Sequence, residues 1–416
     1  MTTAPAGADP SLDTRLIKAL TYLMFMMFAM TTDAVGVIIP QVIKEFGLGM
    51  TAGGTFHYAT MSGIALAGLA LGFLADRMGR KPAIILGLAL FAGSTFLFSV
   101  GRSFEFFVAL LFLSGAAIGV FKTAALALIG DISTSTRSHT STMNTVEGFF
   151  GVGAIVGPAI VAALLAGGAS WKWLYVIAGG LAVALILTAL MVRYPKAVKT
   201  SAPPADLKAT VGMMRDPFAL AFSLGTMLYV GVETAIYVWM PTLLAGYDGP
   251  AILVATYALS IFFVLRAAGR FLGAWMLNRF RWTTVLAASS LMIFVCFLGS
   301  ALLGRGGAVW LLPLSGLFMS VIYPTLNSKG ISCFAKAQHG AVAGVILFFT
   351  CVSAVLSPLA MGAVSDVFGG PQYGFVLATV LAGVLCVALA VNVVKEPAKA
   401  RLARFDDSQY GLDAPL

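Results

Sequence analysis

Ionisable side chains lie inside long apolar stretches of this sequence. Lys122 has eight uncharged residues on each side, and Asp33, Glu147, Glu233 and Arg266 occupy other apolar stretches. In a segment that crosses a membrane, such groups can carry a proton or bind the polar part of a ligand. A charge is costly at such a depth, so each group needs a partner, a cavity or a function.

The composition identifies a membrane protein. Of 416 residues, 59% are hydrophobic and 10% are charged, which excludes an ordinary soluble domain. Segments that cross about 30 Å of hydrocarbon satisfy their backbone as helices. We therefore predict an all-α polytopic protein with twelve membrane-spanning helices near residues 17–40, 54–75, 82–101, 105–130, 141–167, 171–192, 217–244, 251–276, 283–303, 308–331, 340–365 and 372–394.

Basic residues set the predicted orientation. With the N-terminus inside, most Lys and Arg fall in cytoplasmic segments, as at 77–81, 193–215, 279–281 and 395–404. The net charge of +9 follows from this asymmetry and does not indicate nucleic acid. No cleavable signal peptide is visible, so we expect a multi-pass protein of a bacterial-type inner (plasma) membrane with both termini cytoplasmic. The cysteines have no paired spacing and predict neither a disulfide nor a metal site.

A loop with a specific motif follows the second predicted span, GFLADRMGRKP from Gly72 to Pro82. Its basic residues hold the loop at the inner face, and its carboxylate can pair across helices. The loop resembles the signature of the major facilitator superfamily, G-x-L-A-D-R-x-G-R-K, and fills every defining position. The resemblance implies two pseudo-symmetric six-helix bundles that rock about a central site, with a gating loop at Gly72, Asp76, Arg77, Gly79 and Arg80. A role in topology alone is the alternative.

The two halves of the chain echo each other at an offset of about 200 residues, as in internally repeated transporters. A polar, basic stretch separates them, so we predict an N-terminal bundle at 1–192, a cytoplasmic linker at 193–216 and a C-terminal bundle at 217–416. The second copy of the loop, GAWMLNRFR, has Leu277 and Asn278 in place of Asp76 and Arg77. Matching pairs are Pro40 with Pro241, Gly72 with Gly273, Arg80 with Arg281 and Pro158 with Pro358.

Further motifs are similar to those of the fucose:proton symporter group. They are LYVGVETAIYVWMPTLL in the seventh span, FVLRAAGRFLGA in the eighth and GLFMSVIYPTLNSKGI in the tenth. Two carboxylate positions of that group differ here. Lys122 stands where the fucose permease has a glutamate, and Asp33 lies about one turn before the position that aligns with its aspartate, which is Gly36 here. The resemblance therefore does not carry over proton coupling or fucose by name.

Depth along the helices suggests ion pairs. At 1.5 Å per residue, Lys122 lies about 13 Å and Glu147 about 10 Å from the cytoplasmic helix ends, so we predict a Lys122–Glu147 pair. Glu233 and Arg266 form a second candidate pair between the seventh and eighth helices. Asp33 has no partner at its level, and an unpaired buried carboxylate favours its protonated form.

Asp33 is thus the first candidate for the coupling proton, with Glu147 and Glu233 as further candidates. Arg270 is assigned to the inner end, where its side chain can reach the headgroups, and is left out of the site. A purely structural role for each of the two pairs is the alternative.

Hydroxyl and amide groups beside aromatic rings favour a small polyhydroxylated ligand, because rings cover the C–H face and polar groups bind hydroxyls. On the seventh helix the spacing of four places three side chains on one face, and the tenth repeats the pattern. A monosaccharide fits, and the lysine also admits a sugar acid. The predicted substrate-binding residues are Asp33, Gln41, Lys122, Tyr229, Glu233, Tyr237, Tyr323 and Asn327, and the alternative for any one aromatic is helix packing.

Two other functions compete with proton symport of a sugar. A proton-driven efflux antiporter is favoured by GVGAIVGPAI in the fifth helix, where Gly153, Gly157 and Pro158 match the antiporter motif but Ile160 and Val161 do not. A membrane sensor would need an added soluble domain. The sequence has no catalytic constellation or nucleotide-binding motif, so we expect no enzyme activity and no cofactor. The expected partners are the solute, protons and the lipid bilayer, and we expect a monomer.

Overall fold

The computed structural model describes residues 14–48, 50–195, 207–244 and 246–410, and all regular structure within these ranges is helical. Part of the predicted linker, residues 196–206, lies outside them. We call the helices before this gap the N-terminal group. They are α1 (Thr14–Thr32), α2 (Val35–Phe46), α3 (Met50–Leu71), α4 (Leu74–Arg77), α5 (Arg80–Phe96), the 3-10 turn η1 (Leu97–Ser99), α6 (Phe104–Asp131), α7 (Thr136–Ala166) and α8 (Trp173–Met191).

The helices after the gap form the C-terminal group. They are α9 (Leu207–Met213), α10 (Pro217–Thr234), the π-helical turn η2 (Ala235–Trp239), α11 (Met240–Leu244), α12 (Ile252–Thr256), α13 (Ala258–Arg279), α14 (Trp282–Met319), α15 (Ile322–Ser332), the 3-10 turn η3 (Lys336–Gln338), α16 (His339–Phe368), α17 (Pro371–Lys395) and α18 (Lys399–Tyr410). The short α9 and the terminal α18 were not predicted, because neither belongs to a long apolar run.

Ten helical stretches among the described residues are long and apolar enough to cross a membrane. The longest, Trp282–Ser332, has 51 residues, far more than one crossing of about 30 Å needs. Gly304 breaks it with a φ of 61°, a backbone conformation that favours glycine, so α14 consists of two helical arms.

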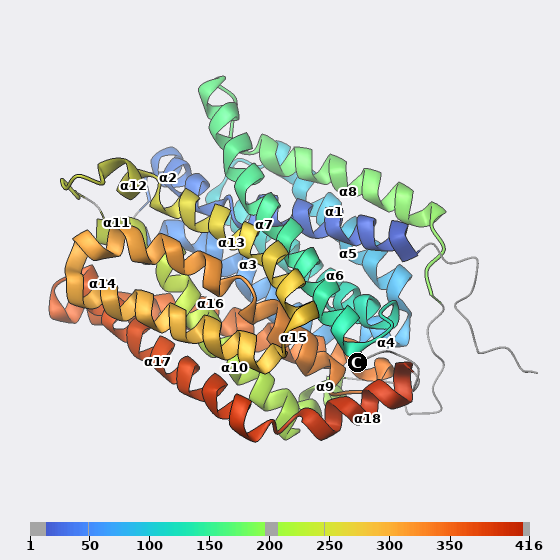
Figure 1. Ribbon diagram of the computed structural model, residues 1–416. Coiled ribbons are helices and arrows are strands. Elements are labelled where there is room, and N and C mark those ends of the chain that lie inside the picture. Colours follow the sequence, from blue (N-terminus) through green and yellow to red (C-terminus); the bar gives the residue numbers. More distant parts are fainter. Residues whose placement is uncertain (1–13, 49, 196–206, 245, 411–416) are drawn as a thin grey trace, which may run out of the picture.

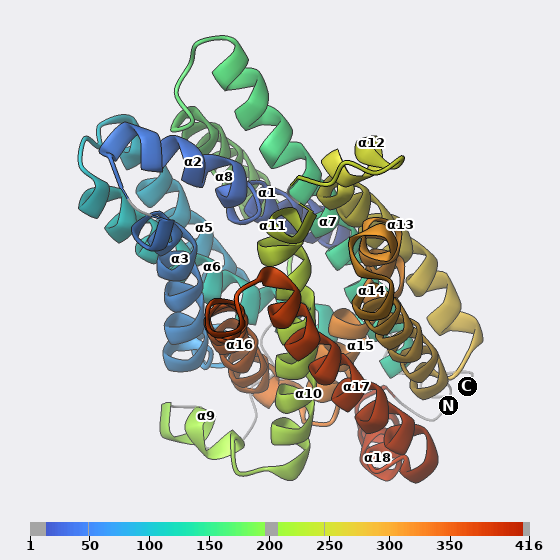
Figure 2. The same ribbon diagram turned by 90° about the vertical axis from the view of Figure 1, so that its left-hand side faces the viewer.

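The two groups lie beside each other along their length. In Figure 1, α4, α9 and α18 lie at one end of the molecule, which we call the α4 end, and α2, α11 and α12 lie at the opposite end, the one that faces the viewer in Figure 2. The groups meet where α3 packs against α16 and where α7 packs against α13 and α15. The described residues of the basic stretches that the sequence assigns to the cytoplasm, at 77–81, 193–195, 207–215, 279–281 and 395–404, lie in or next to helices that begin or end at the α4 end.

Three long helical segments are interrupted midway. The first breaks at Asp33, between α1 and α2, where the hydroxyls of Thr31 and Thr32 both bond the Phe28 carbonyl and compete with the helical ladder. The second widens into η2 next to Pro241, and the third breaks at Ser320 and Val321, just before Pro324. A proline cannot donate to the carbonyl four residues earlier, which explains both interruptions.

Candidate functional site

Charged side chains gather at the level of these three interruptions. Three are carboxylates, Asp33, Glu147 and Glu233, and three are cations, Lys122, Arg266 and Arg270. They come from α6, α7, α10, α13 and the break after α1, so both groups contribute. Interrupted helices and π-turns are typical of binding sites in transporters, because they expose backbone and re-aim side chains.

Glu233 pairs with Arg266, as the sequence predicted. Glu233 Oε1 lies 2.8 Å from Arg266 Nη2 and 2.6 Å from the Tyr229 hydroxyl, and both Glu233 and Arg266 are buried. The Tyr229 hydroxyl also lies 2.9 Å from the carbonyl oxygen of Met319, at the end of α14. Its single proton serves one acceptor at a time, so this hydroxyl links the ion pair to the break before α15.

The predicted Lys122–Glu147 pair is wrong. Glu147 instead lies 3.3 Å, Oε2 to Nη2, from Arg270, and Arg270 Nη1 also donates to the backbone carbonyl of Glu147. Arg270 was assigned to the inner end of its helix, yet only 1% of its side chain is exposed. The pair joins α7 of the N-terminal group to α13 of the C-terminal group. Because the pair is buried, loss of either partner would leave the other as an uncompensated buried charge.

Lys122 is held by aromatic rings. Its Nζ lies 4.6 Å from the ring centroid of Phe150 and 5.8 Å from that of Phe25, within the range of cation–π attraction. No carboxylate among the described residues lies within ion-pairing distance of this ammonium. Lys122 is half-buried, so it retains hydrogen-bond donors for a ligand.

Asp33 stands at the break between α1 and α2. One carboxylate oxygen lies 2.8 Å from the Thr32 hydroxyl, whose single proton serves either this oxygen or the Phe28 carbonyl, and the side chain is half-buried. The cations whose charges act on it are Arg266, Lys122 and Arg270, although none of them lies within ion-pairing distance. Asp33 and Lys122 are thus the two charges of the cluster that have no ion-pair partner among the described residues.

The other predicted ligand residues divide by position. Tyr237 lies in η2, one turn beyond Glu233, and Tyr323 follows the break before α15. Asn327 is fully buried one turn after Tyr323 on α15, with 3.4 Å between its Nδ2 and the Tyr323 hydroxyl. Gln41 lies on α2, on a different helix from α1 and beyond the break at Asp33.

The predicted gating loop ties the groups together at the α4 end. Arg80 bonds the carboxylates of Asp76 and Asp131, and its Nη2 donates to the Lys336 carbonyl at 2.8 Å. Asp76 accepts hydrogen bonds of 3.1 Å from both Gly340 N and Ala341 N at the start of α16. Burial raises the pKa of the Asp76 carboxyl, while Arg80 and the two amides oppose that effect.

The remaining loop residues have other tasks. Gly79 has a φ of 96°, which lets the chain turn into α5. Gly72 lies against the backbone of α16, where an added Cβ would come within 3.1 Å of the Gly340 carbonyl oxygen. Arg77 is exposed.

Further polar contacts close the α4 end. His139 Nδ1 lies 2.8 Å from Ser332 Oγ, and the Thr140 hydroxyl lies 2.9 Å from Ser328 Oγ, so α7 is bonded to α15. On α18, Asp406 accepts from the Thr136 amide at 3.0 Å, and Arg401 donates to the carbonyl of Cys333. Among the described residues, the hydrogen bonds that we find between the two groups lie at the central level or at the α4 end.

Comparisons with known proteins agree with this architecture. The family model described as Major Facilitator Superfamily matches residues 21–358. The chain is 24% identical over 397 residues to the L-fucose-proton symporter of Escherichia coli (strain K12), covering 84% of this chain and 87% of that protein. It is 23% identical over 364 residues to the glucose/galactose transporter of Brucella abortus biovar 1 (strain 9-941), covering 83% and 87%. The crystal structure of the transporter FucP in the outward conformation superposes with a TM-score of 0.77 at 23% identity, covering 90% of this chain and 98% of that one.

Proposed function

The chain belongs to the Major Facilitator Superfamily, and we propose that it is a secondary transporter that moves a small polar solute, a monosaccharide or a sugar derivative, together with protons. We assign its twelve crossings to two six-helix bundles, residues 1–192 and 217–416, joined by a cytoplasmic linker at 193–216. The two arms of α14, together with α3, extend the ten apolar stretches to twelve.

The α4 end is assigned to the cytoplasm of a bacterial inner membrane, because the basic residues concentrate there. Since the hydrogen bonds between the groups lie at the centre and at this end, we infer an inner gate that is closed and a site that faces outward. In alternating access, the groups then rock to close the outer end and break the α4-end contacts.

The observation that carries the proposal is the uneven pairing of the central charges. Two carboxylates have arginine partners, Glu147 with Arg270 and Glu233 with Arg266. Asp33 has none, so it is the carboxylate that can gain a proton without breaking an ion pair. Protonation from outside removes a charge before the groups rock, and release to the cytoplasm resets the site.

For the solute we infer a hydroxyl-rich compound. Tyr237 and Tyr323 supply ring faces, and Lys122 and Asp33 supply a donor and an acceptor at the same level. The E. coli and Brucella relatives are named for sugars. A sugar acid would use the Lys122 ammonium, which is why both classes belong in the first assay.

The test uses purified protein in liposomes that contain a pH-sensitive dye. Pools of sugars and sugar acids are added outside, and the pool that acidifies the lumen is split until one solute remains. Uptake is then measured with the lumen one pH unit more alkaline than outside. For one proton per solute, this gradient supports about tenfold accumulation. We expect Asp33→Asn to exchange solute across the membrane but to accumulate none.

Glu45→Gln is the matched control. Glu45 is an exposed carboxylate that bonds Lys172, and it lies on α2, at the end of the molecule opposite to the α4 end. It should accumulate solute as the wild type does. Accumulation by Asp33→Asn would exclude Asp33 as the coupling group. Solute-induced alkalinisation of an acidic lumen would instead support the antiporter alternative.

A further inference from the structure

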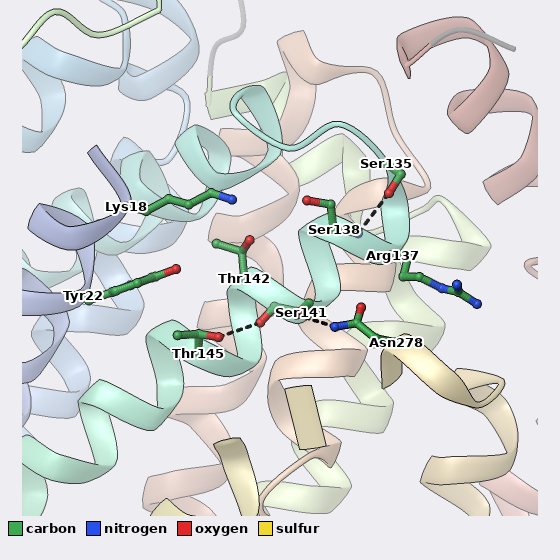
Figure 3. A pocket seen from close by; sticks show the side chains of 9 residues that line it. All are labelled: Lys18, Tyr22, Ser135, Arg137, Ser138, Ser141, Thr142, Thr145 and Asn278. Atoms are coloured by element: carbon green, nitrogen blue, oxygen red, sulfur yellow. Dashed lines mark hydrogen bonds between the residues drawn. The ribbon is translucent and has the colours of Figure 1, made fainter. Parts of the chain in front are cut away.

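A polar pocket lies at the α4 end, away from the central charges. It has a volume of about 400 Å³ and lies between α1, α7 and α13. Figure 3 shows Lys18 and Tyr22 pointing from α1 toward the hydroxyls of α7, with Asn278 of α13 on the other side. The full lining is Lys18, Tyr22, Ser135, Arg137, Ser138, Ser141, Thr142, Thr145 and Asn278.

The chemistry of this lining favours an anion. It holds two cations, six hydroxyl groups and one amide, and none of the nine side chains is a carboxylate. No carboxylate among the described residues lies within ion-pairing distance of Lys18 or Arg137. The pocket also includes the start of α7, where Ser135 is the N-cap and the helix dipole is positive.

One carboxylate lies nearby and limits this charge. Asp406 of α18 binds the amide and the hydroxyl of Thr136, next to Arg137. It offsets part of the helix dipole but forms no ion pair with the pocket cations. The pocket therefore keeps an excess of positive charge.

We propose that this pocket binds one phosphate-bearing anion, with Lys18 as its counter-charge and the α7 hydroxyls as donors, while Arg137, which Figure 3 shows directed away from Lys18, adds positive charge at the rim. Charge-assisted hydrogen bonds from several donors are the usual means of holding a phosphate. Several lining residues lie near helix ends, among them Lys18 in the second turn of α1 and Asn278 next to the last residue of α13. This is the depth of lipid headgroups, so the phosphate can belong to an anionic lipid or to a soluble ester.

Binding there should favour the closed α4 end. The Asn278 amide donates to Ser141 Oγ at 3.2 Å, so the pocket wall is completed by a contact between the two groups. When the groups separate at this end, α13 leaves α7 and the wall is lost. An anion that contacts both sides therefore binds the closed state more tightly and shifts the equilibrium toward it.

The test begins with delipidated full-length protein in detergent. Three probes are titrated: inorganic phosphate, dihexanoyl phosphatidylglycerol as an anionic lipid, and dihexanoyl phosphatidylcholine as its zwitterionic counterpart. Native mass spectrometry counts bound molecules, and tryptophan fluorescence follows the unfolding midpoint. We expect one saturable site for phosphate, for phosphatidylglycerol or for both, and the probe that saturates identifies the source of the phosphate.

The variant Lys18→Ala/Arg137→Ala should weaken binding at least about tenfold, because the charge-assisted donor Lys18 and the positive charge at the rim are both lost. Arg193→Ala/Lys208→Ala removes the same charge from exposed positions of the linker segment and should bind as the wild type does. If the pocket variant does not fold, Thr142→Val tests the same site, since it removes a lining hydroxyl at constant shape and should cost a fewfold.

Three results would overturn the proposal. They are no saturable binding, equal losses in the pocket and control variants, and phosphatidylcholine binding as tight as that of phosphatidylglycerol. The conformational part has its own readout, the distance between spin labels at positions 193 and 279 in a variant without native cysteines. The saturating probe should narrow that distribution toward the closed distance, and an unchanged distribution would contradict the coupling.

Discussion

Two of the helix pairs that join the groups, α3 with α16 and α7 with α13, place their charges at different depths. The charges beside the α3–α16 contact lie at the α4 end, where Asp76 of α4 accepts from amides in the first turn of α16 and Arg80 of α5 donates to the Lys336 carbonyl in η3. In the second turn of α16 the two backbones touch, because Gly344 lies directly on the Gly68 carbonyl near the end of α3. The α7–α13 contact has its ion pair at the centre, Glu147 with Arg270, and a single neutral hydrogen bond from Asn278 at the α4 end.

The difference shows how one repeated architecture can divide two tasks. A charge at the α4 end can hold the gate closed without contacting solute. A charge at the centre lies at the level of the proposed solute site, so bound solute can change its interactions directly. We infer that α3–α16 is mainly a closing contact and that α7–α13 connects closure to the central charges. Four substitutions test this division.

The largest effect is expected from Arg270→Met. The change leaves Glu147 buried without its cation, and breaking one partner of a buried pair costs about 3–5 kcal/mol. The unfolding midpoint of the purified protein should fall steeply. Glu147→Gln/Arg270→Met should recover much of the loss, because both charges are removed together.

Arg279→Met is the control for Arg270→Met, since Arg279 is exposed at the end of the same helix. Its unfolding midpoint should match that of the wild type. A double variant as unstable as the single one would show that Arg270 contributes through packing and not through its pairing.

Gly344→Ala should have the second-largest effect. An added Cβ would overlap the Gly68 carbonyl, and relief of such crowding costs about 1–3 kcal/mol. Separation of α3 from α16 should lower the unfolding midpoint and broaden the spin-label distances at the α4 end. Gly93→Ala is the matched change, because nothing lies within 4 Å of its added Cβ, and an equal effect there would contradict the close-approach argument.

Asp76→Asn should mainly move the conformational equilibrium. The amide loses the charge that Arg80 and two backbone amides share, but Arg80 keeps Asp131 as a partner. We expect the closed state of the α4 end to lose about 1–2 kcal/mol of stability relative to the open state. A larger open fraction should then appear in the distribution of distances between spin labels at positions 193 and 279. An unchanged distribution would show that the gate is held elsewhere, for instance by α18.

Particular residues show what the sequence could predict. The span 217–244 coincides with Pro217–Leu244, because apolar length and flanking polar residues define a crossing. The Glu233–Arg266 pair followed from the succession of the seventh and eighth predicted helices. Glu147 and Arg270 also lie at similar depths, and Arg270 is four residues after Arg266 on one face, which was the signal that could have found it.

What the sequence did not contain was the neighbour of each helix. Depth alone allowed Glu147 to pair with Lys122 or Arg270, and the packing of α7 against α13 decided between them. The break at Asp33 depends on two threonine hydroxyls competing for one carbonyl, which no hydropathy pattern reveals. The contacts of α18 were not predicted because that helix is short and polar, so no apolar run in the sequence indicates it.

Asn278→Asp should have the smallest effect. It compares the two helix pairs most directly, because it gives α7–α13 a charge at the α4 end, where the α3–α16 pair already has one. It places a carboxylate next to Leu277, the position that corresponds to Asp76, on the wall of the polar pocket. The introduced carboxylate can accept from the Ser141 hydroxyl, so stability should change by about 1 kcal/mol or less. The added negative charge beside Arg137 should weaken phosphate or phosphatidylglycerol binding about fivefold, whereas Asn278→Ala removes the hydrogen bond without adding charge and should weaken it less. Equal losses of affinity in the two variants would mean that the pocket selects its ligand by shape and not by charge. The proposed difference between the charged contact at α3–α16 and the uncharged contact at α7–α13 would then be wrong.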